Sequence, residues 1–345
     1  MLLPETASPA NVLVDLIDGV GVLTLNRPAV LNALDLATVR ALTRQLDAWA
    51  HDPAIRAVLL RGSGERAFCA GGDVRSLYQL QRQGAPELVS YFDEEYALDC
   101  RIHRYPKPTI ALMDGVVMGG GMGISQGCTH RLVTERTRMA MPETAIGIFP
   151  DVGASYFLSR LPPALGVYIG VVGDTLSGAD AVASGLADRL VPSALFADLR
   201  ALIAAIDAEA WPAAPTQTKI PSLLTAPVLA AVERHFGHGS VEEILAALAG
   251  ETDPLLRPWV ERTQGLLAQR SPLMLCVTFA QLQRGRRLGL EDCFRMERTM
   301  MEYSFAHGDT MEGIRALLID KDRNPRWRHR TVEEVGREEV EAFFG

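Results

Sequence analysis

The chain has 345 residues, of which 48% are hydrophobic and 22% are charged, and its formal net charge is −8. This composition is typical of a globular protein and excludes a disordered or collagen-like chain. The acidic balance argues against a nucleic-acid partner, although a local basic patch is still allowed. Five cysteines without a CxxC pair argue against a metal site or a disulfide framework, so we expect a cytoplasmic protein.

The N-terminal residues MLLPETASPA lack the basic region of a signal or transit peptide. The longest uncharged stretch after Asp114 covers residues 115–129 and is too short and too rich in glycine to cross a bilayer. We therefore expect no membrane partner.

Strand and helix patterns alternate along the first half of the chain. Short apolar runs predict strands at residues 20–25, 55–60, 109–113 and 131–134. Apolar residues at helical spacing predict a helix over residues 34–50. Strands that alternate with helices indicate an α/β fold with covered sheets.

The second half of the chain shows a different pattern. Residues 209–221 (EAWPAAPTQTKIP) hold three prolines and little periodicity, which predicts a linker. Helical patterns follow at 241–248, 258–267, 273–283 and 290–305, and a basic, proline-broken loop at 323–330 precedes a final acidic helix. We therefore divide the chain into a core (10–208), a linker-like segment (209–221) and a helical C-terminal region (222–345).

Two glycine-rich segments each follow a predicted strand. AFCAGGD (67–73) on its own reads as a plain glycine turn, and DGVVMGGGMG (114–123) on its own reads as close packing of a strand on a helix. The second lies ahead of a predicted helix at 122–127, and it matches neither a Walker loop nor a dinucleotide fingerprint. Together they suggest two backbone N–H donors aimed at one oxygen, which is an oxyanion hole.

A third segment, MAMPETAIGIFPDVGAS (139–155), places Glu143 and Asp151 in an apolar context, each directly after a proline. A buried carboxylate is costly unless it is paired or used, and burial raises its pKa. The alternative is that both acids cap the N-termini of helices.

The three segments, together with LTLNRPAVLNALD (23–35), resemble the crotonase superfamily, also called the enoyl-CoA hydratase/isomerase family. FDEEYALD (92–99), MPETAIGIFPDVGASYFLSRL (141–161) and IRALLIDKDRNPRW (314–327) resemble its 3-hydroxyisobutyryl-CoA hydrolase branch. The resemblance implies a spiral of ββα units with a helical C-terminal region, and an acyl-CoA thioester as substrate, with no other cofactor. The family often forms trimers or hexamers, so a homo-oligomer is one expected state.

The resemblance also implies roles for individual residues. The backbone N–H groups of Gly72 and Gly120 match the oxyanion donors, and Glu143 matches the catalytic acid. Asp151 matches the second acid of the hydrolase branch, and Glu95 matches a further acid of the same site. Asn32, Ala33 and Ala70 match the residues that contact the adenine of CoA in the family.

One position departs from the hydratase pattern. Family hydratases carry a second catalytic glutamate three residues after the middle glycine, where this chain has Gly123. Adding water to a double bond needs one group to activate the water and another to move the α-proton. We therefore expect thioester hydrolysis, and the alternatives are an enoyl-CoA hydratase, a Δ3,Δ2-enoyl-CoA isomerase or a non-catalytic acyl-CoA-binding subunit.

Overall fold

The computed structural model describes residues 10–209, 212, 214–215 and 219–345. Its strands form two sheets, one with the order β1-β2-β3-β5-β7-β10 and one with the order β4-β6-β8-β9. The strands are β1 (Val12–Ile17), β2 (Val20–Leu25), β3 (Ala57–Gly62), β4 (Ala67–Cys69), β5 (Thr109–Met113), β6 (Val116–Met118), β7 (His130–Val133), β8 (Arg138–Ala140), β9 (Leu176–Ser177) and β10 (Arg189–Leu190).

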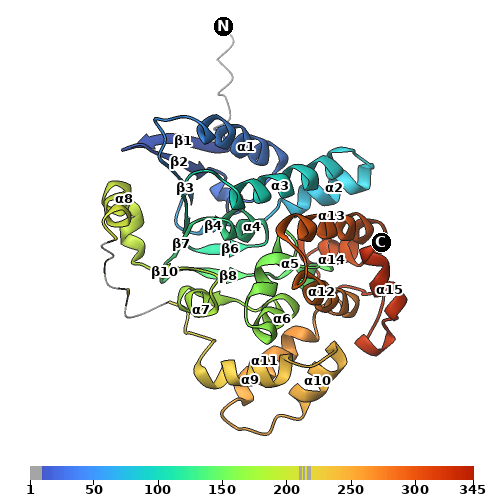
Figure 1. The fold of residues 1–345 in the computed structure, drawn as a ribbon. Helices are drawn as coiled ribbons and strands as arrows, with labels where there is room; N and C mark the ends of the chain where they lie inside the picture. The colour runs from blue at the N-terminus through green and yellow to red at the C-terminus, as the bar shows by residue number, and fades with distance from the viewer. Residues whose placement is uncertain (1–9, 210–211, 213, 216–218) are drawn as a thin grey trace.

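Successive strands along the chain join the two sheets in turn. Each of the pairs β3–β4, β5–β6 and β7–β8 sends its first strand to the larger sheet and its second strand to the smaller one (Figure 1). Neighbours within these series are parallel, while β1 is antiparallel to β2 and β9 is antiparallel to β8. This repeat confirms the predicted spiral of ββα units.

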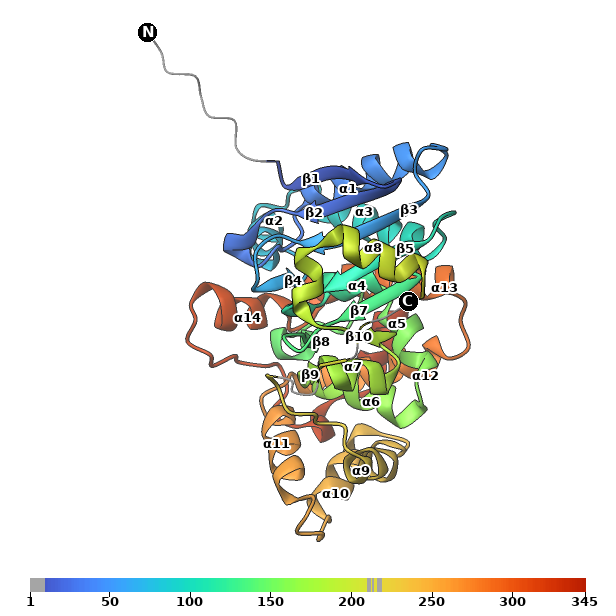
Figure 2. The same ribbon diagram turned by 90° about the vertical axis from the view of Figure 1, so that its left-hand side faces the viewer.

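Helices cover both halves of the molecule (Figures 1 and 2). In the first half they are α1 (Leu36–Ala50), α2 (Val74–Gln83), α3 (Glu87–His103), α4 (Gly120–Gln126), α5 (Ala154–Phe157), α6 (Pro163–Val172), α7 (Gly178–Ser184) and α8 (Leu199–Asp207). In the second half they are α9 (Ala226–Phe236), α10 (Val241–Ala249), α11 (Arg257–Leu267), α12 (Pro272–Gly285), α13 (Leu290–His307), α14 (Thr310–Ile314) and α15 (Arg337–Glu341). Across the described ranges, no helix combines the length and the apolar character needed to cross a membrane.

The predicted elements are present, with small shifts at their ends. The strand at 20–25 is β2 residue for residue, whereas the strand predicted at 55–60 begins two residues later as β3. The helix predicted at 122–127 begins at Gly120, because the glycine run itself forms the first turn of α4. Helix α1 begins where Asp35 accepts a hydrogen bond from the N–H of Thr38, a standard N-cap.

The hydrophobic core runs through both halves of the chain, from Val12 in β1 to Phe343 near the C-terminus. A second, smaller core fills the space between the outer face of the larger sheet and α8. Residues 210–211, 213 and 216–218 of the predicted linker lie outside the described residues. The division of the chain at 209–221 therefore stays a prediction.

Candidate active site

The two glycine-rich turns lie side by side. Gly72 directly precedes the N-cap of α2, and Gly120 is the first residue of α4. A Cβ atom placed on Gly120 would lie 3.4 Å from the backbone nitrogen of Gly72. Within the described part of the chain the N–H of Gly72 makes no hydrogen bond, and a first helical residue has no partner inside its helix. Two free N–H donors therefore border one small space.

Acid and hydroxyl groups approach the backbone of these glycine turns closely. A Cβ on Gly120 would lie 2.6 Å from Glu95 Oε1, and one on Gly72 would lie 2.7 Å from Tyr91 Oη. Gly119 has φ 47°, which disfavours other residues, and its Cβ would lie 2.9 Å from Glu143 Oε1. The carboxyl group of Glu143 thus lies against the GGG run.

Glu143 opens a short 3-10 helix, η2 (Glu143–Ile146), directly after Pro142. Its side chain is buried, and Oε2 has no hydrogen-bond partner among the described residues. Burial raises the pKa of Glu143 well above its ordinary value, and the nearby charge of Asp151 raises it further. The N-cap of η2 is Pro142, so Glu143 does not cap this helix.

Asp151 does not cap a helix either, which corrects the capping alternative. Its Oδ2 accepts a hydrogen bond of 2.7 Å from the hydroxyl of Tyr96. The N–H groups of Gly153, the N-cap of α5, and of Ser155 in its first turn donate instead to the buried carboxyl group of Glu297, at 2.7 and 2.8 Å. Because a distant helix supplies this cap, Asp151 is left free to face the cavity.

Helix α3 presents a row of polar side chains at four-residue spacing. Tyr91 Oη lies 2.9 Å from Glu95 Oε1, one turn along the helix. A further turn along, Asp99 is fully buried, and neither of its carboxyl oxygens has a hydrogen-bond partner in the part of the chain that the structure describes. The helical spacing therefore stacks one tyrosine and two acids beside the glycine turns.

The acids cannot all be ionised at once. Burial and the charge of Asp151 raise the pKa of Glu95 to about 8. Burial also raises the pKa of Asp151 itself, to about 6, although the hydrogen bond from Tyr96 opposes this shift. These groups lie close together in a medium of low polarity, so their titrations are coupled. The raised pKa values therefore favour the protonated form of at least one of these acids at neutral pH.

These side chains surround a cavity of about 180 Å³, which we call the acid pocket. Its lining contains the predicted residues Gly72, Gly120, Glu95, Glu143, Asp151 and Ala70. Apolar side chains, including Leu77, Phe92, Ile146, Met301 and Leu317, complete the wall. The structure thus brings together the two proposed donor glycines and the three predicted acids.

Asn32 and Ala33 do not line this pocket. The side chain of Asn32 accepts from the N–H of Arg27 and donates to the carbonyls of Ser63 and Ala67, at 3.0, 3.0 and 2.9 Å. The carbonyl of Ala33 accepts a 2.7 Å bond from the guanidinium of Arg27. Both residues therefore shape the turn next to the AGGD segment, and the adenine contact predicted for them stays a prediction.

Sequence reasoning missed four side chains at this site: Tyr91, Tyr96, Asp99 and Glu297. The spacing of Tyr91, Glu95 and Asp99 was visible as a helical face within residues 91–99 (YFDEEYALD). Glu297 lies on α13, more than a hundred residues away, and no local pattern links it to α5.

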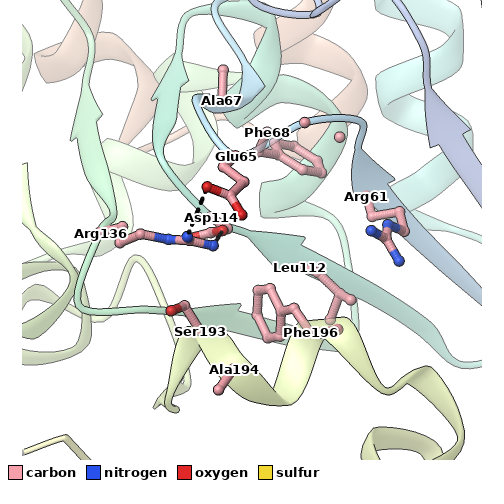
Figure 3. Close-up of a pocket in the computed structure, with 13 residues that line it drawn as sticks. Arg61, Glu65, Ala67, Phe68, Leu112, Asp114, Arg136, Ser193, Ala194 and Phe196 are labelled. Atoms are coloured by element: carbon pink, nitrogen blue, oxygen red, sulfur yellow. Dashed lines mark hydrogen bonds and ion pairs between the residues drawn. The ribbon is translucent and has the colours of Figure 1, made fainter.

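A separate cavity of about 270 Å³ lies between the larger sheet and the segment before α8 (Figure 3). Arg136 pairs there with Asp114, and it lies 3.9 Å from Glu65 (Figure 3). This cavity and the acid pocket have no lining residue in common. Among the described residues, no group of three or more His, Cys, Asp or Glu side chains is placed to hold a metal ion.

Known proteins resemble this chain over nearly its whole length. The family described as enoyl-CoA hydratase/isomerase matches residues 20–344. A relative from Arabidopsis thaliana named 3-hydroxyisobutyryl-CoA hydrolase 1 is 40% identical, covering 99% of this chain and 93% of the relative. A relative from Gallus gallus named 3-hydroxyisobutyryl-CoA hydrolase, mitochondrial, is 38% identical, covering 99% and 90%.

Solved structures give the same fold under other names. A structure described as a carnitinyl-CoA dehydratase from Mycobacterium thermoresistibile is 40% identical, with a TM-score of 0.89 and coverage of 97% of this chain and 96% of that one. A structure described as an enoyl-CoA hydratase from Rhodobacter sphaeroides is 37% identical, with a TM-score of 0.86 and coverage of 97% of both chains. The matched residues and the shared fold show that this chain belongs to the enoyl-CoA hydratase/isomerase family, the crotonase superfamily.

Proposed function

We propose that the protein hydrolyses a short 3-hydroxyacyl-CoA thioester, first of all 3-hydroxyisobutyryl-CoA, to the hydroxy acid and free CoA. The observation that carries this proposal is the convergence of two unbonded glycine N–H groups and the carboxyl group of Glu143 on one small pocket. The names of the curated relatives support the same reaction.

In this proposal the thioester carbonyl lies between the N–H groups of Gly72 and Gly120. Attack on the carbonyl carbon moves negative charge onto its oxygen, and fixed donors stabilise that charge. Removing one such donor typically costs about 10²–10³ in rate. No cofactor is required, because the amides and an acid supply the chemistry.

Glu143 acts in one of two ways. As a nucleophile it forms a mixed anhydride with the acyl group and expels CoA thiolate, and water then hydrolyses the anhydride. As a general base it removes a proton from water, which attacks the carbonyl carbon directly while the C–S bond breaks. Either way the thiolate gains a proton, and the carboxylate of Glu143 is regenerated.

Asp151 is assigned to the 3-hydroxyl group of the substrate. The hydroxyl of Tyr96 holds one oxygen of this carboxyl group, which leaves the other to accept from the substrate. Glu95, held by Tyr91, would support the same network. The small volume of the acid pocket suits a short acyl group.

A hydratase is the second candidate, because the structure named for Rhodobacter sphaeroides carries that description. The surroundings of Gly123 argue against it here. A Cβ atom at that position would lie 2.7 Å from both Asp99 Oδ2 and Val152 Cβ, so no room is left for a second glutamate. The cytoplasmic location and a homo-oligomeric state remain part of the proposal only.

The test is a panel of purified CoA thioesters, with 3-hydroxyacyl, plain acyl and enoyl groups, assayed for release of free thiol. We expect the fastest release from 3-hydroxyisobutyryl-CoA and little from the enoyl thioester. Consumption of the enoyl thioester without thiol release would instead establish a hydratase or an isomerase. Binding without any turnover would identify a non-catalytic subunit.

A further inference from the structure

Helix α13 of the C-terminal region borders the site, although it is far from the other site elements along the chain. It packs against α5, which directly follows Asp151, and against α3, which carries Tyr96 (Figure 1). Its Met301 lines the acid pocket. No step of the proposed hydrolysis uses a side chain of this helix.

Glu297 is the acid of α13 that reaches the turn after Asp151. Its side chain is fully buried. Its Oε2 accepts a 2.7 Å hydrogen bond from the N–H of Gly153, and its Oε1 accepts a 2.8 Å bond from the N–H of Ser155. Burial raises the pKa of Glu297 to about 8, and the hydrogen bonds from Ser155 and Gly153 oppose this shift. Since burying a carboxyl group is costly, these two backbone donors are what offsets the cost.

The turn between Asp151 and α5 has an unusual backbone. Val152 has a φ angle of 52°, and a β-branched residue is strained in this left-handed region. Gly153 follows with a φ angle of 88°, which favours glycine. Strain of this kind persists where the surroundings fix it, and it gathers at functional sites. The N–H that donates to Glu297 Oε2 belongs to the peptide between these two residues, so the bond fixes the plane of that peptide.

Apolar packing from the same face of α13 holds the turn from a second direction. Phe294 lies three residues before Glu297, and a Cβ atom on Gly153 would lie 2.9 Å from Phe294 Cζ. The rings of Phe294 and Tyr96 have centroids 5.9 Å apart, and the hydroxyl of Tyr96 donates to Asp151 Oδ2. One face of α13 therefore contacts both supports of Asp151, the backbone turn that follows it and the tyrosine that binds it.

We propose that Glu297 is a positioning residue for Asp151, through which the C-terminal helix α13 sets the preference for a 3-hydroxyacyl group. This inference rests on the proposed function, in which Asp151 accepts a hydrogen bond from the 3-hydroxyl. Glu297 fixes the peptide after Val152, and that peptide fixes the direction of the Asp151 side chain. A hydrogen bond weakens steeply as its angle worsens, so a small rotation of Asp151 weakens the bond to the hydroxyl. The thioester carbonyl, placed at Gly72 and Gly120, is affected less.

The test variant is Glu297→Gln, which keeps the size of the side chain but replaces one carboxyl oxygen with an NH2 group. That group can only donate, so it cannot accept the N–H of Gly153 or Ser155 that it faces. Glu302→Gln is the matched control, because it makes the same chemical change at an exposed position of α13. The ion pair of Glu302 with Arg298 is 3.5 Å long, and exposed pairs contribute little. Thermal unfolding of each variant checks that it folds.

The measured quantity is the ratio of kcat/KM for the 3-hydroxyacyl thioester to kcat/KM for the unsubstituted acyl thioester. We expect Glu297→Gln to lower this ratio about tenfold, whereas Glu302→Gln keeps it within about twofold of the wild type. In a chain that already carries Asp151→Asn, Glu297→Gln should change the ratio less than about twofold, because the two residues act as one unit. Equal losses on both substrates, an unchanged ratio, or independent losses in the double variant would overturn the proposal.

Calorimetry separates this inference from the proposed function. If the wild-type protein hydrolysed no thioester, the dissociation constants of the two thioesters would still report a contact with the hydroxyl group. A preference for the 3-hydroxyacyl thioester that Glu297→Gln removes and Glu302→Gln keeps would support the positioning role. No preference in the wild type, or a preference that Glu297→Gln leaves unchanged, would overturn it. Phe294→Leu, which trims the packing against Gly153, replaces Glu297→Gln if that variant does not fold, and the same outcomes decide.

Discussion

The acid pocket and a neighbouring cavity of about 590 Å³ share two wall residues, Ala145 and Leu317, yet they carry opposite kinds of charge. We call the second the arginine cavity, after Arg270 and Arg323 in its wall. The acid pocket gathers three carboxyl groups and no cation in its lining, whereas the arginine cavity has two arginines and no acid. Burial acts differently on carboxyl groups and on arginine. It lets a crowded carboxyl group keep its proton and become neutral, but arginine stays charged.

The contrast matters for the charge that each cavity carries. In the acid pocket burial favours the protonated form of the acids, although Asp151, whose pKa is raised only to about 6, still supplies negative charge at neutral pH. The reaction would then form a new carboxylate beside the acids, and mutual repulsion favours its departure.

The largest expected effect comes from removing the acid beside the glycine run. Glu143→Ala should lower thioester hydrolysis by at least about 10³-fold, because both proposed routes need this carboxylate. Binding of the thioester should persist, since the N–H donors of Gly72 and Gly120 are unchanged. Thiol release and calorimetry measure the two quantities. Unchanged turnover in this variant would refute the role of Glu143.

Asp151→Asn tests the second acid and should give a smaller, selective effect. We expect kcat/KM for a 3-hydroxyacyl thioester to fall by roughly 10- to 100-fold more than that for the unsubstituted acyl thioester, because a charged hydrogen bond to the 3-hydroxyl is weakened. Tyr96→Phe is a matched control that removes only the bond orienting Asp151. It should move the ratio in the same direction by less. Equal losses on both substrates would count against a contact with the hydroxyl.

The pH dependence of hydrolysis sharpens the electrostatic comparison. Glu143 must be ionised to act, and burial together with Asp151 raises its pKa above the ordinary 4.5. Activity should therefore rise with pH, with a midpoint in kcat/KM above that of a free glutamate. Asp151→Asn removes a neighbouring negative charge, so the midpoint should move to lower pH. A midpoint near 4.5 in both proteins would show that Glu143 is not held in a desolvated site.

The sequence predicted the parts of this site that lie within continuous segments. AFCAGGD, DGVVMGGGMG and the PET and FPDVG turns each follow or join short elements, so their positions could be inferred from strand and helix patterns. The cap that Glu297 provides for α5 depends on packing between helices far apart in the chain. That Arg270 forms no ion pair with a carboxylate of the described residues also depends on tertiary structure, because the sequence does not show which acids lie within reach of a given arginine.

Replacing Asp99 should give the smallest of these effects, and it tests whether a buried carboxyl group near the acid pocket is neutral. Both oxygens of this buried carboxyl group lack a partner among the described residues, and burial raises its pKa well above the ordinary value. The folded protein therefore holds a proton that the unfolded chain releases near pH 4. Stability from this group is present below that pH and declines as pH rises toward the folded-state pKa, by at most about 1.4 kcal/mol per pH unit.

Asp99→Asn removes this titration while keeping the shape of the side chain. The variant should therefore become more stable relative to the wild type between pH 5 and pH 8, by on the order of 1–3 kcal/mol in the free energy of unfolding. Urea denaturation at the two pH values measures the difference, and Glu87→Gln, an exposed change on the same helix at a side chain without an ion pair among the described residues, is the control. A difference that stays constant with pH would mean that Asp99 is ionised in the folded protein. The space beside Gly123 would then hold a charge, and the acid pocket would be less neutral than its contrast with the arginine cavity requires.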